Sequence, residues 1–531
     1  YRWGIPTYSG TMTGGVSAEN VATTISGLLL NRTNVLRTAT YEVIPNAGAC
    51  EGKMFTVTVF VNPTPEIVPL STTVCSGTTF VVTPTNILNG IVPDNVVFRW
   101  NVPSVSGSVT GGASAENVSK IITGRLLNRT NAMLTALYEV TPRSGNCEGT
   151  MFTLTVFVNP TPEIVPMSVT VCSGLPFAVT PTDMVNGIVP NPTIYRWDVP
   201  TYSGTMTGGV SAENVATTIS GLLLNRTNVL RTATYMVTPM AGNCEGATFS
   251  VTVFVNPTPE ITAMSTTTCN GVQFEVSPAN TRDGIVPFGT QYRWNVPITT
   301  ASVVGGQSDS GKLQIRGTLT NLSNQAQEAY YTVTPTSGSC EGVAFALTVY
   351  LNPTPVISAM STVTCSGVMF NVTPVNDRDG IVPIGTKYKW GVPTYQGTIT
   401  GGQSNSNQSG IFGLLRNRTN VTRTATYIVT PSIGNCGEGT PFTLTVTIPP
   451  TPEIVPMSVT VCSGLPFAVT PTDVTNGIVP NPTFYRWGIP TYSGTMTGGV
   501  SAENVATTIS GLLLNRTNVL RTATYEVIPN A

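Results

Sequence analysis

The stretch Phe249-Ser-Val-Thr-Val-Phe-Val-Asn-Pro-Thr-Pro259 contains the two features that decide the fold of this chain. From Phe249 to Val255 every second residue is Phe or Val, and Ser250 and Thr252 lie between them. This period of two predicts a β-strand with one buried face. The Pro-Thr-Pro that follows cannot continue a strand ladder, because proline has no N–H to donate. We therefore predict a strand that ends in a short, stiff joint, and the same tripeptide recurs at residues 63–65, 160–162, 353–355 and 450–452.

Three further marks repeat with one spacing. Trp recurs every 96 or 97 residues inside Tyr/Phe-Arg/Lys-Trp, and so do two cysteine motifs, Gly-x-Cys-Glu-Gly (or a close variant) and Cys-Ser/Asn-Gly. A period this long is typical of a whole small domain and not of a solenoid repeat. Residues 1–47 are identical to residues 485–531, so we expect the chain to be a window from a longer repetitive protein. The predicted domains are the C-terminal part of a repeat at 1–62, whole repeats at 63–159, 160–256, 257–352 and 353–449, and the N-terminal part of a repeat at 450–531.

Within residues 160–256 the sequence predicts seven short strands and no amphipathic helix. Turn-forming residues such as Gly, Pro and Asn-Gly separate the apolar runs. Seven short strands in about 97 residues are typical of an immunoglobulin-like β-sandwich, so the predicted fold is an all-β tandem array of such sandwiches that forms an elongated rod. The expected strands are residues 163–171, 177–180, 194–199, 204–209, 217–224, 233–237 and 249–255.

The aromatic residues that recur in each period are predicted to lie in the cores. Tyr195 and Trp197 share one face of the third strand and Arg196 faces the other way, while Tyr235 opens the sixth strand as the corner tyrosine of such a sandwich does. A sugar-binding Trp would have to lie on the surface, and the alternation with Arg196 argues against that alternative. The predicted core aromatics are Trp3, Trp100, Trp197, Trp294, Trp390, Trp487, Tyr138, Tyr235, Tyr331 and Tyr427.

Composition excludes several classes of function. The formal charge is −1 and only 10% of residues are charged, so no basic field is available for nucleic acid or for a membrane surface. The chain has no histidine, which removes the commonest general base and the commonest transition-metal ligand. The chain contains no apolar run of 18 or more residues that would predict membrane insertion, and no Cys-x-x-Cys pair that would predict a zinc site. We therefore predict a protein that is not an enzyme and has no cofactor, metal site or catalytic residue.

Three weaker motifs have a structural alternative. Asn376-Asp-Arg-Asp-Gly380 resembles part of a calcium loop, but the remaining spacing and the final Glu are missing, so we favour a turn. Glu213 lies in Ser-Ala-Glu-Asn, which supplies only one carboxylate to its domain. Asn-Arg-Thr is formally a glycosylation sequon, for which we favour a hairpin turn, although a sugar at that place is expected to be exposed and tolerable. This tripeptide begins at residues 31, 128, 225, 417 and 515.

The recurring motifs resemble the PKD-like repeats of giant Bacteroidota cell-surface proteins, among them gliding-motility adhesins. This resemblance extends over the whole chain and implies export by the type IX secretion system and display on the bacterial outer membrane. The partners implied are the secretion and motility machinery, through regions outside these residues. The motifs that carry the resemblance are Cys172-Ser-Gly, Asn186-Gly-Ile-Val-Pro190, Tyr195-Arg-Trp197, Ala233-Thr-Tyr235, Gly242-Asn-Cys-Glu-Gly246 and Val253-Phe-Val-Asn-Pro-Thr-Pro259.

Ten cysteines, two in each period, predict disulfides and an oxidising, extracytoplasmic compartment. Two pairings stay open. Strand counting places Cys172 at the end of its domain that leads to the next one and Cys244 at the opposite end, farther apart than the roughly 7 Å that a disulfide allows. This favours pairing between domains, as Cys75–Cys244, Cys172–Cys340 and Cys269–Cys436. The alternative is pairing within each domain, as Cys75–Cys147, Cys172–Cys244, Cys269–Cys340 and Cys365–Cys436.

These observations predict a structural stalk or filament in a giant secreted adhesin, used for gliding motility or surface attachment. The expected partners are neighbouring repeats of the same chain and a surface polysaccharide or other substratum. Two alternatives remain open: repeated polysaccharide-binding modules that act by multivalency, and spacer repeats of a large secreted glycanase.

Overall fold

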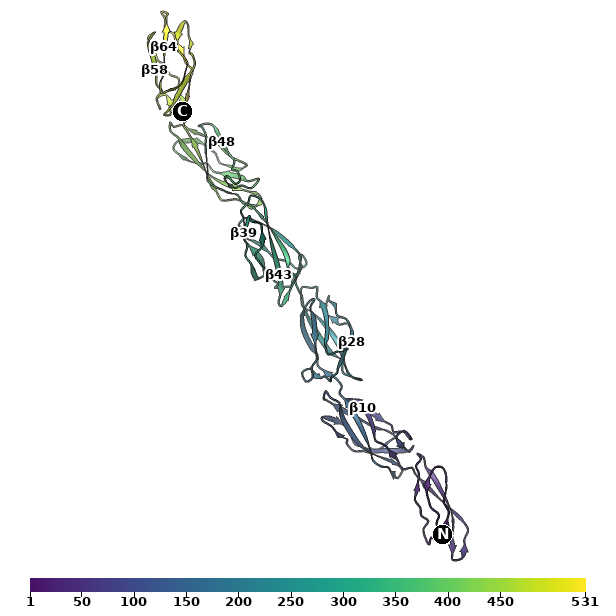
Figure 1. Ribbon diagram of the computed structural model, residues 1–531. Helices are drawn as coiled ribbons and strands as arrows, with labels where there is room; N and C mark the ends of the chain where they lie inside the picture. Colours follow the sequence, from purple (N-terminus) through teal and green to yellow (C-terminus); the bar gives the residue numbers. More distant parts are fainter. The chain divides into compact units, whose positions relative to one another are not determined.

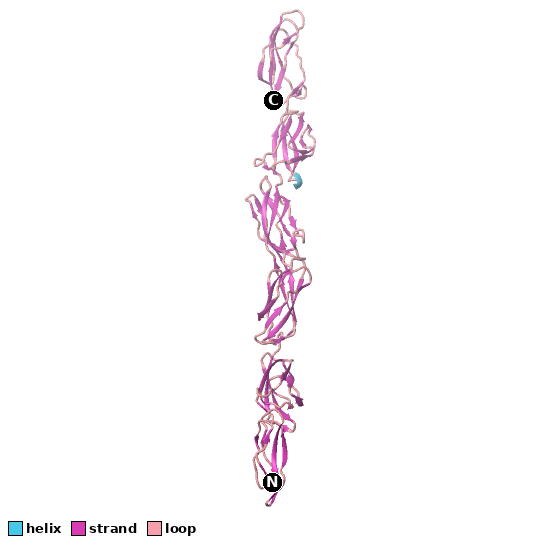
Figure 2. Ribbon diagram, turned by 90° about the vertical axis from the view of Figure 1, so that its right-hand side faces the viewer, coloured by secondary structure: helices cyan, strands magenta, loops and turns pink.

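The computed structural model describes residues 1 to 531 and is built almost entirely of strands. The exception is one 3₁₀ helix, Gly434–Cys436, which is the small helical turn visible in Figure 2. The prediction of an all-β array of immunoglobulin-like sandwiches is therefore confirmed. The chain separates into two compact units, Tyr1–Thr258 and Pro259–Ala531, which divide inside one Pro-Thr-Pro tripeptide.

Each hydrophobic core is confined to one period of the sequence. No core takes buried residues from two periods, so every module buries its own apolar side chains. The buried residues of the five cores lie within residues 3–43, 67–158, 164–255, 261–351 and 357–448.

The module of residues 160–256, marked in Figure 1 by the label β28, is typical of the whole modules. Its main sheet has the order β22-β32-β30-β25-β28, with β26 and β31 also paired to β30. The second sheet has the order β23-β29-β27, and β21 pairs with β24. The strands are β21 (Glu163–Ile164), β22 (Met167–Cys172), β23 (Pro176–Val179), β24 (Gly187–Ile188), β25 (Ile194–Trp197), β26 (Thr201–Tyr202), β27 (Thr207–Gly208), β28 (Ala212–Ala216), β29 (Ile219–Leu224), β30 (Arg231–Ala241), β31 (Cys244–Glu245) and β32 (Phe249–Asn256).

The alternating residues of β32 fill the core as the period of two requires. Phe249 is 3% exposed and Val251, Val253 and Val255 are fully buried, while the residues between them are half-buried. Burial of each such side chain contributes about 1.5–3 kcal/mol relative to exposure. On β25, Tyr195 and Trp197 face the core together with these residues.

The first and last strands of each whole module pair in parallel. In residues 160–256 the register runs from Met167 opposite Val251 to Cys172 opposite Asn256. The predicted first strand 163–171 is therefore two strands, because β21 pairs with β24 and only β22 joins the main sheet. The same parallel pair is β10 (Leu70–Cys75) with β20 (Phe152–Asn159), β34 (Met264–Cys269) with β45 (Phe345–Asn352), and β47 (Met360–Val363) with β56 (Phe442–Ile448).

Two sequence expectations about this module are corrected. The segment around Glu213, which lies outside the seven expected strands, is the edge strand β28, and it pairs with β25. Its pattern is hidden because Asn214 has a φ of 55° and the register shifts between Tyr195 and Trp197. The predicted edge strand 204–209 is reduced to β27.

The corner role expected for Tyr235 is not realised. Tyr235 is 1% exposed, but its hydroxyl has no hydrogen-bond partner. Burial raises its pKa to about 12, with a smaller contribution from Tyr202, because the charged form would lose hydration. A Cβ at Gly209, where φ is 70°, would lie 2.6 Å from this hydroxyl, so glycine is required there. Tyr235 therefore fills the core without a hydrogen bond from its hydroxyl.

Candidate functional site

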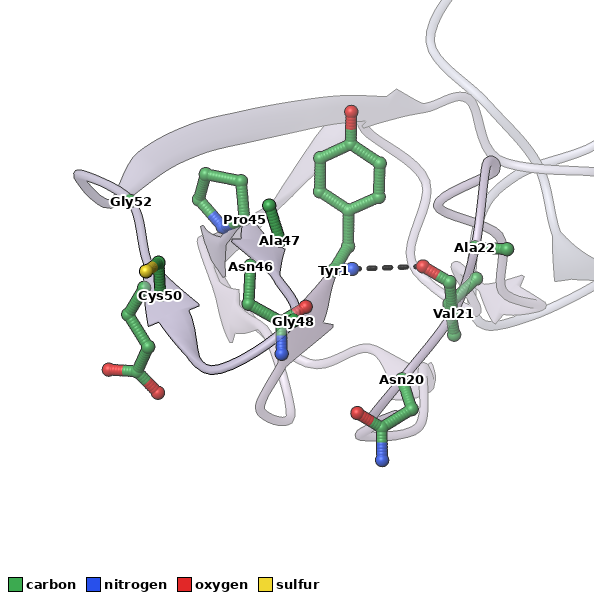
Figure 3. Close-up of a pocket in the computed structure, with 11 residues that line it drawn as sticks. Tyr1, Asn20, Val21, Ala22, Pro45, Asn46, Ala47, Gly48, Cys50 and Gly52 are labelled. Atoms are coloured by element: carbon green, nitrogen blue, oxygen red, sulfur yellow. Dashed lines mark hydrogen bonds between the residues drawn. The ribbon is translucent and has the colours of Figure 1, made fainter.

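No group of three or more Cys, Asp or Glu residues is placed to hold a metal ion. The chain contains no helix with the length and apolar character needed to cross a bilayer. Figure 3 shows a pocket beside Cys50, where the Tyr1 nitrogen donates to the Val21 carbonyl at 2.9 Å. Its lining includes Cys50 and Glu51 but no histidine to serve as base, so it lacks a nucleophile–base pair.

The joints between modules carry several specific contacts. We call the end of a module at which its last strand begins the upstream end, and the end at which that strand finishes the downstream end. Cys75 finishes β10 at the downstream end of residues 63–159, opposite Asn159. Cys244 lies in the hairpin before β32, at the upstream end of residues 160–256. These two cysteines form a disulfide with a Cα–Cα distance of 5.5 Å.

The same connection is present in the second compact unit. Cys269 and Cys436 form a disulfide with a Cα–Cα distance of 5.4 Å. Cys172 and Cys340 each take part in a disulfide as well. Disulfides between modules thus recur along the chain.

The alternative of pairing within a module is wrong. Each of the four cysteines in the Cys75–Cys244 and Cys269–Cys436 disulfides has its partner in a different module. Every pair expected within a module contains one of these four, so none of them forms: Cys75–Cys147, Cys172–Cys244, Cys269–Cys340 and Cys365–Cys436. The reason is the parallel register: in residues 160–256 the first cysteine aligns with the finish of β32, and the second precedes its start. Seven residue steps along β32 already span about 23 Å, far beyond disulfide reach.

The Pro-Thr-Pro joint is bound on both sides. The Thr161 hydroxyl donates to the Ser76 carbonyl of the preceding module at 3.2 Å. On the other side, a Cβ at Gly246 would lie 2.2 Å from the Pro162 carbonyl oxygen, so only glycine allows the hairpin to approach the joint this closely. The joint is therefore held by packing and hydrogen bonds as well as by its own proline rings.

A side-chain hydrogen bond between loops adds a further tie at this joint. Asn131, in the turn at the downstream end of one module, donates to Asp183 in the first long loop of the next at 2.9 Å. Asn34 and Asp94 make the same contact one module earlier, at 3.3 Å. The sequence analysis missed these contacts because their members lie in different periods.

An ion pair fixes the hairpin that carries the second cysteine. Arg196, beside the core Trp, contacts Glu245 at 3.0 Å, immediately after Cys244. Both side chains are about half exposed, so each pair contributes about 0–1 kcal/mol and serves mainly to orient the hairpin. The sequence indicates this ion pair by two residues that recur together, the Arg or Lys before each Trp and the Glu that follows the second cysteine of each period. The equivalent pairs are Arg2–Glu51, Arg99–Glu148, Arg293–Glu341 and Lys389–Glu438.

The Asn-Arg-Thr turn is not an exposed sugar site. Asn225 is 2% exposed, and its amide nitrogen donates to the carbonyls of Val229 and Val255, both at 2.8 Å. Its Oδ1 accepts from the backbone N–H and the hydroxyl of Thr227, at 3.0 and 2.7 Å. The expectation that a sugar would be exposed and tolerable here is therefore wrong, since the amide is already fully bonded inside the fold.

The acidic loop that resembled a calcium site is also internally satisfied. Asp379 accepts from the Val375 N–H at 2.7 Å and contacts Arg378 at 2.8 Å. The hydrogen bond from Arg378 lowers the pKa of this carboxyl despite the opposing effect of burial. Asn376 accepts from the Val382 N–H at 2.9 Å. These oxygens brace a turn, as the favoured interpretation predicted.

Four cysteines have no disulfide partner, and three of them are exposed. They belong to the same two motifs as the bonded cysteines. The unpaired residues are Cys50, Cys147, Cys365 and Cys462.

The chain belongs to the PKD-like domain family, whose profile matches it five times, at residues 1–65, 72–162, 164–259, 266–355 and 361–452. Among curated proteins no match was found. A tandem array of PKD-like domains with disulfides suggests an extracellular module of structural or adhesive type, and such domains are typically non-catalytic.

Solved structures with similar chains include arrays of small β-domains. The human desmocollin-1 ectodomain is 13% identical, covers 87% of this chain and 97% of its own, and has a TM-score of 0.23. Titin domains I67–I69 are 12% identical, cover 54% and 96%, and have a TM-score of 0.25. The protocadherin gamma-B4 extracellular domain is 10% identical, covers 93% and 88%, and has a TM-score of 0.18.

Proposed function

We propose that this chain is a load-bearing stalk segment of a large secreted adhesin, which holds an adhesive element away from a bacterial outer membrane for attachment or gliding. Its domains are the repeats at 63–159, 160–256, 257–352 and 353–449, with a partial repeat on each side. Export by the type IX system and contact with a surface polysaccharide belong to the same proposal.

The observation that carries the proposal is the parallel pairing of first and last strands. Tension applied at the two ends of residues 160–256 pulls β22 and β32 in opposite directions along their length. All six residue pairs from Met167–Val251 to Cys172–Asn256 are then loaded together in shear. Separating them requires their hydrogen bonds to break at once, which resists force better than opening them one by one.

The joints support the same function. A stalk must pass force from one module to the next without the joint acting as a weak point. The Cys75–Cys244 disulfide and the Thr161–Ser76 hydrogen bond both connect the modules across the Pro-Thr-Pro joint. A multivalent binding module would require the same exposed binding site in each repeat, whereas the pockets around Cys50 and around Trp390 are lined by different positions of the repeat.

Deletion of whole modules in the native gene tests the proposal. Removing residues 160–352 takes out two periods and leaves the joint motifs intact. A stalk predicts that attachment persists while a label on the far end comes about 80 Å closer to the cell, taking about 40 Å per sandwich. Attachment that falls with module number, together with glycan binding by the purified chain, would instead favour polysaccharide-binding repeats. An unchanged label distance would reject the stalk.

A further inference from the structure

We propose that the disulfides between modules limit how far the array can lengthen, by carrying load along a covalent route that bypasses most of every module. This inference rests on the proposed stalk function, since it concerns what happens under tension. It follows from where the two cysteines lie: one finishes the first strand, and the other precedes the last strand of the next module.

The route can be followed through the first compact unit. From Thr64 the chain runs along the first strand to Cys75, crosses the disulfide to Cys244, and continues along β32 to Thr258. The segment 76–243 lies inside the loop that the disulfide closes, with a sequence separation of 169 residues. Load that travels by the route never has to pass through this segment.

The second unit continues the pattern. From Pro259 the chain reaches Cys269, crosses to Cys436, and leaves along β56 toward Thr451. The enclosed segment again covers most of two modules, with a separation of 167 residues. Between Thr64 and Thr451 the route therefore takes the first strand of one module and the last strand of the next in turn.

The length of this route decides the consequence. It contains about 51 residue steps of at most about 3.5 Å, which with two disulfides gives about 190 Å. Four folded sandwiches placed end to end, as a stalk requires, span about 160 Å. Complete loss of every core could then lengthen the array by only about 30 Å. Without disulfides the same 387 residue steps would reach about 1,350 Å.

Unfolding of the hydrophobic cores therefore changes the length of the stalk only slightly. A module that unfolds transiently under load keeps its ends at nearly the same distance, so its strands can pair again without working against a long slack chain. Loop closure over a short distance also makes the return faster than closure over a fully extended segment. An array of ordinary sandwiches without these disulfides would instead lengthen by about 300 Å for each module lost.

Single-molecule pulling of the full 531-residue chain tests this. The handles are attached through click-reactive residues at Thr64 and Thr451, both exposed and outside the enclosed segments. Cys50, Cys147, Cys365 and Cys462 are replaced by serine in all samples, because free thiols could exchange with the disulfides. Cys172 and Cys340 are replaced as well, so that the two crossings of the route are the only disulfides left. Peptide mapping without reductant accompanies each sample, so that the Cys75–Cys244 and Cys269–Cys436 peptides are seen directly.

The expected gain in contour length is below about 50 Å for the oxidised chain. Cys75→Ser removes one crossing and lengthens the route by about 169 residue steps, so a gain of about 600 Å is expected. Full reduction should give about 1,200 Å. Stepwise gains of about 300 Å in the oxidised chain, or an unchanged length in Cys75→Ser, overturn the inference. Failure of the module deletion on cells would overturn the stalk but leave this length limit in place.

Discussion

Asn225 offers the sharpest test of how these modules are held together, because one buried side chain makes four hydrogen bonds. In Asn225→Ala the carbonyls of Val229 and Val255 each lose a donor, and the Thr227 N–H loses its acceptor. Each lost bond costs about 1 kcal/mol, and a group left unpaired in the interior costs more. We therefore expect a loss of about 3–4 kcal/mol, a large part of the roughly 5–15 kcal/mol available to a domain of this size.

The assay is native-state hydrogen exchange of the full chain, followed by mass spectrometry of peptides. Peptides from β32 report residues 160–256, and peptides from β20 report the neighbouring module as an internal reference. A loss of 3 kcal/mol corresponds to about 150-fold faster exchange in β32. The matched control is Arg226→Ala, since Arg226 lies in the same turn but is exposed.

The result that would refute the reasoning is a change of less than threefold in β32. An equal acceleration in β20 would also refute it, because the five hydrophobic cores share no residues. Asn225→Asp keeps the acceptor but places a carboxylate against two carbonyls, so it should exchange at least as fast as the alanine variant.

Four further outcomes are expected. Burial raises the pKa of Tyr235 to about 12, so the free energy of unfolding should be constant below about pH 10 and decrease between pH 10 and pH 12. The decrease should reach up to about 2.7 kcal/mol for each such tyrosine, and urea unfolding at pH 8 to 12 measures it. Tyr235→Phe should weaken that dependence and stabilise its module by about 1 kcal/mol, because the buried hydroxyl is unpaired; a destabilised variant would contradict this. Asp283→Asn should keep the hydrogen bond that the Ala279 N–H donates to this side chain, as Asn186 does in the preceding module. Asp283→Ala should lower the free energy of unfolding by about 1 kcal/mol, as measured by urea unfolding. Gly246→Ala should push the hairpin off the joint and leave Cys244 more reactive to a maleimide in partly reduced chain, while Gly391→Ala, with open space around it, should not.

The periodic features of the fold were predictable from the sequence because they are local. The alternation from Phe249 to Val255 predicts a strand with one buried face, and its burial follows. The polar edge strand β28 could not be predicted, since its pairing with β25 interrupts the alternation at Asn214. The missed corner hydrogen bond of Tyr235 has the same origin: a hydroxyl's partner depends on neighbours that no local pattern names.

The sequence by itself determined the module, its length, its all-β character and the positions of its aromatic core residues, because hydrophobic periodicity and turn residues act over a few positions of the chain. Only the tertiary structure decided which cysteines meet, that Asn225 is buried, and that Arg196 orients the hairpin through Glu245. The contacts of Asn225 with Val255, of Arg196 with Glu245 and of Cys75 with Cys244 join residues about 30 to 170 positions apart, and the disulfides depend also on which end of one sandwich faces the next. Distance in space, set by strand register, decides them, and spacing along the sequence does not.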